Sequence, residues 1–112
     1  MKISQIKSIL NAELICGEQY LDNEVFTACG SDMMSDVLAY VKDQAVLLTG
    51  LVNSQVIRTA EMMDIEAIVF VRGKEPDDAI IGMAKMKDIA LMSTEYPLYK
   101  ACGLLYSNGL GN

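Results

Sequence analysis

The chain has 112 residues, of which 52% are apolar and 21% are charged, a composition typical of one soluble domain with a single core. Its net charge of -6 disfavours nucleic-acid binding, which needs a basic surface. The longest apolar runs, such as residues 67–71, are far shorter than the roughly 20 residues of a membrane span, and the N-terminus lacks an apolar signal segment. We therefore expect one cytoplasmic domain over residues 1–112, with no nucleic-acid or membrane partner.

The reactive residue types exclude most catalytic classes. The sequence has no histidine, which removes Ser-His-Asp triads, Cys-His dyads and histidine-ligated zinc. Its cysteines, Cys16, Cys29 and Cys102, are widely spaced and form no CxxC pair, so neither a disulfide framework nor a cluster site is indicated. We expect reduced thiols, no catalytic residue, no metal and no cofactor.

The first part of the chain mixes short elements of both kinds. Hydrophobic periodicity and turn residues predict, in order, a helix, a strand, a polar turn, a strand and an amphipathic helix over residues 2–11, 12–16, 17–23, 24–29 and 34–41. Gly17 is expected to end the first strand, and Gly30 the second.

The second part alternates strands with helices more regularly. The expected strands are 45–49, 67–71 and 89–92, and the expected helices are 53–63, 76–84 and 97–105. Asn53 suits a helix N-cap, Pro76 suits a first helical turn, and Gly109 can end the last helix.

These strands are apolar on both faces, which favours a parallel sheet covered by helices on both sides. Right-handed crossovers place the ends of such strands at one edge. The sequence therefore predicts an α/β fold: a single domain of three layers, with a mostly parallel sheet built from βα units.

The carboxyl edge of that sheet is the expected ligand site, because open α/β sheets bind ligands there, against helix N-termini. Small polar residues, glycines and one guanidinium meet at this edge and suit a phosphate or a carboxylate: Asp32, Thr49, Gly50, Asn53, Arg72, Gly73, Ser93 and Thr94. Neither GxGxxG nor a P-loop is present. Purely structural alternatives stay open: tight turns at the glycines, a helix cap at Asn53 and a solvated charge at Arg72.

Two glycines and several tyrosines suggest self-association. Gly82 and Gly103 fall inside predicted helices, where glycine costs about 1 kcal/mol relative to alanine. Close packing of another backbone, for example at a subunit interface, would explain them. Tyr99 and Tyr106, on the last predicted helix, suit structural or dimer contacts.

Four stretches, at residues 30–38, 47–50, 56–60 and 65–76, together resemble a DRTGG domain, and the resemblance covers nearly the whole chain. The Gly-Asp-Arg of the family would fall at 50–52 and its Thr-Gly-Gly at 71–73, where this sequence keeps Gly50 and Gly73. The match implies a stand-alone member of that family.

The resemblance also implies a function. Such domains accompany CBS domains in nucleotide-regulated pyrophosphatases, lie beside phosphotransacetylase domains and resemble the N-terminal domain of HPr kinase/phosphorylase. Family members are typically dimeric, and stand-alone members are associated with iron-only hydrogenase systems. We therefore expect a non-enzymatic regulatory or interaction domain, a homodimer that senses a nucleotide or small anion. One alternative is an accessory protein of an iron-only hydrogenase or related iron–sulfur oxidoreductase. The other is an enzyme, although a kinase would need the P-loop domain.

Overall fold

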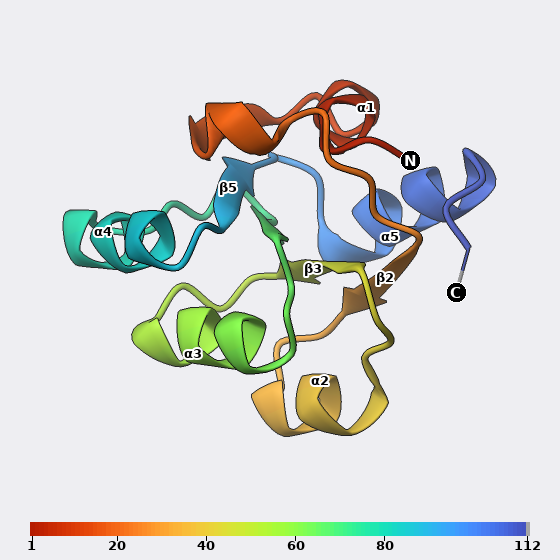
Figure 1. Cartoon of the computed structure of the whole chain (residues 1–112). Helices are drawn as coiled ribbons and strands as arrows, with labels where there is room; N and C mark the ends of the chain where they lie inside the picture. Colours follow the sequence, from red (N-terminus) through yellow and green to blue (C-terminus); the bar gives the residue numbers. More distant parts are fainter. Residues whose placement is uncertain (112) are drawn as a thin grey trace.

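A five-stranded sheet forms the centre of the computed structural model, which describes residues 1–111 (Figure 1). The strands lie in the order β1-β5-β4-β3-β2. Their bounds are β1 Glu13–Cys16, β2 Thr27–Gly30, β3 Ala45–Thr49, β4 Ala67–Phe70 and β5 Ala90–Ser93. Strands β2, β3, β4 and β5 pair in parallel, and β1 pairs antiparallel with β5. The predicted mostly parallel sheet is confirmed.

Helices cover both faces of this sheet, as predicted. They are α1 Ile3–Ile9, α2 Met34–Tyr40, α3 Ser54–Met62, α4 Asp78–Met86 and α5 Leu98–Ser107, with a short 3-10 helix, η1, at Glu18–Tyr20. Figure 1 shows α1 and α5 on one side of the sheet and α2, α3 and α4 on the other. Within residues 1–111, no helix is long and apolar enough to span a membrane.

Alternation along the central strands builds two separate cores. Val46 and Leu48 of β3 pack in the core beneath α1 and α5, whereas Leu47 packs in the core against α2, α3 and α4. Strands β3, β4 and β5 are buried along their whole length. Side chains on both faces of such a strand are buried and are therefore mostly apolar, so the polar residues gather at the strand ends.

The second strand differs from its prediction. It begins at Thr27 rather than residue 24, because Glu24 makes only an isolated bridge with Lys2. It also includes Gly30, which pairs with Leu48 instead of ending the strand. A Cβ on Gly30 would lie 2.5 Å from the Cys102 sulfur, so glycine here permits close packing of α5.

The start of α4 is a second correction. Pro76 does not lie in the first helical turn, because α4 begins at Asp78 with Asp77 as its N-cap. The Asp77 carboxylate accepts the N–H of Ile80 at 3.0 Å, a bond that a proline cannot provide. The predicted N-cap Asn53 is confirmed: its side-chain oxygen accepts two N–H groups of α3.

The glycines inside helices have no packed neighbour within residues 1–111, so their place at a subunit interface stays a prediction. No neighbouring backbone packs against Gly82 or Gly103: a Cβ on either would meet nothing within 4 Å. Within the described part of the chain, close packing therefore does not explain them. Gly109, by contrast, follows α5 with a φ of +100°, as a helix-ending glycine should.

Candidate functional site

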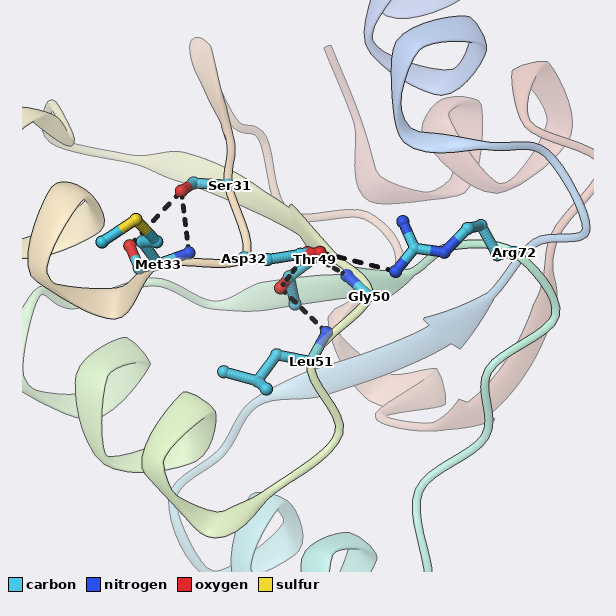
Figure 2. Close-up of polar contacts among 7 residues, drawn as sticks. All are labelled: Ser31, Asp32, Met33, Thr49, Gly50, Leu51 and Arg72. Atoms are coloured by element: carbon cyan, nitrogen blue, oxygen red, sulfur yellow. Dashed lines mark hydrogen bonds and ion pairs between the residues drawn. The ribbon is translucent and has the colours of Figure 1, made fainter.

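Four of the eight predicted site residues meet at the carboxyl edge of the sheet. Asp32 follows β2, and Arg72 follows β4. Thr49 is the last residue of β3, and Gly50 comes directly after it. The parallel register brings these strand ends level, with Gly30 opposite Leu48 and Thr49 opposite Phe70. Figure 2 shows the Arg72 side chain reaching back toward Asp32 beside Thr49 and Gly50.

The Asp32 carboxylate is the centre of this cluster. Its Oδ1 accepts the Gly50 N–H at 2.7 Å and the Thr49 hydroxyl at 3.1 Å. Its Oδ2 pairs with Arg72 Nη2 at 3.4 Å. The Thr49 oxygen in turn accepts the Leu51 N–H at 3.1 Å, which fixes the direction of the hydroxyl. Three donors from two loops thus surround one oxyanion.

Glycine at position 50 leaves room for the guanidinium, which lies directly over it. A Cβ on Gly50 would overlap the Nη2 atom of Arg72. Arg72 itself has a left-handed backbone, with φ +59°, as does Gly73 at +69°. Such a conformation costs a non-glycine residue about 1 kcal/mol or more. Backbone bonds hold it: the Arg72 N–H donates to the Tyr96 carbonyl and the Gly73 N–H to the Thr94 carbonyl, both at 2.9 Å. The chain turns here so that the guanidinium folds back over β3.

The cluster is partly open to solvent and carries opposite charges. The Arg72 and Asp32 side chains are 44% and 46% exposed. The Gly50 hydrogen bond has the largest influence on the pKa of Asp32 and lowers it. Burial opposes this shift, and the Thr49 and Arg72 side chains each add to the lowering. Asp32 is therefore ionised at neutral pH, and the guanidinium beside it remains accessible.

Asn53 and Gly73 lie at the same edge with other partners. The Asn53 side-chain oxygen is used by the N–H groups of Gln55 and Val56, at 3.0 and 3.3 Å. Gly73 lies against the Glu95 carboxylate, which a Cβ would overlap. Both residues therefore shape the loops beside the cluster in the structure, and their contact with a ligand stays a prediction.

Ser93 and Thr94 use their hydroxyls within the fold. The Ser93 hydroxyl donates to the Lys74 carbonyl at 2.8 Å. The buried Thr94 hydroxyl donates to the Leu10 carbonyl at 2.7 Å and accepts the Tyr96 N–H at 3.3 Å. These bonds join the end of β5 to its neighbouring loops, so a ligand role for either hydroxyl also stays a prediction.

The thiols are poor nucleophiles. Burial raises the pKa of Cys16, Cys29 and Cys102, so the protonated thiol is favoured at neutral pH. Among residues 1–111, no group of three Cys, Asp or Glu side chains is placed to hold a metal ion.

The sequence did not predict an apolar groove between α5 and β2. It has a volume of about 600 Å³, and its lining includes Ala28, Gly30, Cys102, Gly103, Leu105 and Leu110. Tyr99 and Tyr106 also line it and are 92% and 71% exposed. The spacing of Tyr99, Gly103 and Tyr106 marks one exposed face of α5 and was the available signal. Without knowing that α5 packs beside the edge strand β2, that signal could not define a groove.

The fold and this edge together define a three-layer α/β domain with a polar cluster at the carboxyl ends of its parallel strands. The family model for the DRTGG domain matches residues 5–107. The chain therefore belongs to the DRTGG domain family, as its sequence resemblance implied.

The fold is similar to that of a solved structure from another protein. It is the crystal structure of the CBS and DRTGG domains of the regulatory region of Clostridium perfringens pyrophosphatase, complexed with the activator diadenosine tetraphosphate. The TM-score is 0.75 with 18% sequence identity, over 93% of this chain and 45% of that one. This chain thus spans less than half of that structure, and at this identity the likeness shows the fold alone. The comparison with curated proteins found no match.

Proposed function

We propose that this chain is a non-enzymatic regulatory domain that senses a nucleotide or another small phosphorylated anion beside Arg72. One observation carries the proposal: the Gly50 N–H, the Thr49 hydroxyl and the Arg72 guanidinium already converge on an oxyanion, the Asp32 carboxylate. Phosphate oxygens accept hydrogen bonds from the same types of donor. The cluster therefore has the chemistry of an anion site, and its charged side chains are half exposed to solvent.

The comparisons support the regulatory part of this proposal. The domain family of this chain occurs in the regulatory region of a pyrophosphatase that was crystallised with a dinucleotide activator. This favours a sensing domain over the hydrogenase-accessory alternative. In the mechanism we propose, an anion that binds between the loops after β3 and β4 favours one arrangement of those loops. A partner or a second subunit then binds that arrangement in preference to others.

Substitution of Arg72 tests the proposal. Purified protein is titrated with ATP, diadenosine tetraphosphate and inorganic pyrophosphate while its melting temperature is recorded. We expect a concentration-dependent stabilisation that is lost in Arg72→Ala. Arg58→Ala is the matched control, since it removes the same charge from an exposed position of α3. Equal stabilisation of wild type and Arg72→Ala would overturn the assignment.

We also propose that two copies pair through the face of α5 and β2. The open groove, the two exposed tyrosines and the unpacked Gly103 all lie on this face and support the proposal. Tyr99→Glu should then give a monomer in size-exclusion chromatography with light scattering. Met86→Glu, at another highly exposed apolar position, on α4, should leave the mass unchanged. A wild-type monomer, or a dimer in Tyr99→Glu, would refute this face.

A further inference from the structure

We propose that Asp32 is a built-in competitor, which fills the anion site in the free protein and has to leave before an external anion binds. This inference rests on the proposed anion-binding function and adds its regulation. It assigns to Asp32 a role opposite to that of a ligand contact.

Asp32 uses the hydrogen-bond donors that an external anion would need. Its Oδ1 accepts both the Gly50 N–H and the Thr49 hydroxyl, and its Oδ2 takes the guanidinium. The backbone N–H and the hydroxyl each have one proton to donate. A phosphate oxygen can therefore reach them only after the carboxylate has moved.

The bond between Asp32 and Arg72 is weak. Charge-assisted N–H···O bonds are typically about 2.7–2.9 Å long. The Arg72 Nη2 to Asp32 Oδ2 distance is 3.4 Å, and both side chains are nearly half exposed. Water competes with such a pair, so exchange of the guanidinium from carboxylate to phosphate costs little.

The Asp32 side chain can leave the site without unfolding its loop. The turn before α2 is held by its neighbour: the Ser31 Oγ accepts the Met33 N–H at 3.0 Å and donates to the Met33 carbonyl at 3.3 Å. No side chain caps α2, so the helix does not depend on the Asp32 carboxylate. The half-exposed side chain can rotate into water while the backbone stays in place.

These contacts predict that removing the carboxylate strengthens anion binding. Inorganic pyrophosphate is the probe, and binding is followed through the Gly50 amide in two-dimensional NMR spectra. We expect Asp32→Asn and Asp32→Ala to bind about tenfold more tightly than wild type, roughly the effect of one hydrogen bond to a charged group. The alanine variant excludes the possibility that a new asparagine donor creates the gain.

A neutralised charge alone would also favour an anion, so the control is Asp36→Asn. Asp36 is an exposed acid on α2, and its loss changes the net charge by the same amount. It should change the affinity much less than either Asp32 variant does. An equal gain in Asp36→Asn would refute competition and assign the effect to net charge.

The remaining outcomes separate this inference from the proposed function. If wild type and the Asp32 variants bind pyrophosphate equally, with the Gly50 amide shifted, the competitor role is refuted and the anion site stands. Weaker binding in the Asp32 variants makes Asp32 a ligand contact and refutes the inference. No binding in any variant refutes both the inference and the proposed function.

Discussion

Gly50→Ala separates the fold from the anion site. The φ angle of Gly50 is not in the left-handed region, so an alanine meets no conformational barrier there. Its methyl group would instead overlap the Arg72 guanidinium, which is the far end of a flexible side chain. We expect the guanidinium to swing away from Asp32 and from the Gly50 N–H, while the strands stay in register.

The expected changes in stability and in affinity follow from these contacts. The exposed Arg72–Asp32 pair is worth about 0.2–1 kcal/mol, and an alanine in place of glycine returns about 0.4–1 kcal/mol by restricting the unfolded chain. The two nearly cancel, so the melting temperature should move by less than about 4 °C. Binding loses one hydrogen bond to a charged group, about 1.5–3 kcal/mol, or roughly tenfold to hundredfold in affinity.

The assay combines thermal unfolding with a pyrophosphate titration of the same preparations. Gly82→Ala is the control, because its methyl group meets nothing within 4 Å and removes a glycine from α4. It should raise stability by about 1 kcal/mol and leave the affinity unchanged. Unchanged affinity in Gly50→Ala, or unfolding of that variant, would refute the reasoning.

Three further predictions concern stability. Asn53→Ala removes an oxygen that accepts two N–H groups of α3 and should lower the melting temperature by about 4 °C in calorimetry. The size of this decrease should not depend on pH, because the Asn53 side chain is uncharged. Thr94→Val leaves the Leu10 carbonyl without its donor and should cost about 1–3 kcal/mol in urea unfolding, yet keep pyrophosphate affinity; lost affinity would make Thr94 a ligand contact. The contribution of Asp32 to the free energy of unfolding should be fully present above about pH 4, the pKa of an unfolded aspartate, and be lost as the pH falls through its lower folded-state pKa. Asp32→Asn should remove that part of the acid dependence, and an identical pH profile in the variant would contradict the assignment.

Much of the fold was predictable because burial leaves a clear pattern. The fully apolar runs at 45–49 and 67–71 mark strands covered on both faces, which favours parallel pairing. The strand order and the antiparallel pairing of β1 were not predicted. Element ends were less certain. Gly30 looked like a strand end, and only its contact with Cys102 explains why glycine belongs inside β2.

The site was predictable in position and not in detail. Parallel topology brings the ends of β2, β3 and β4 to one edge, so Asp32, Gly50 and Arg72 could be expected as neighbours. Their specific bonds depend on the left-handed backbone at Arg72, which sequence patterns do not reveal. The commitment of the Ser93 and Thr94 hydroxyls to backbone carbonyls likewise depends on long-range contacts.

We propose that Arg72 and Gly50 form an anion site. The most direct test is a pyrophosphate titration of isotope-labelled wild-type protein, followed by two-dimensional NMR. We expect saturable shifts concentrated at Gly50, Leu51 and Arg72 that disappear in Arg72→Ala. Shifts elsewhere in the molecule, or none at all while the protein stays folded, would contradict it.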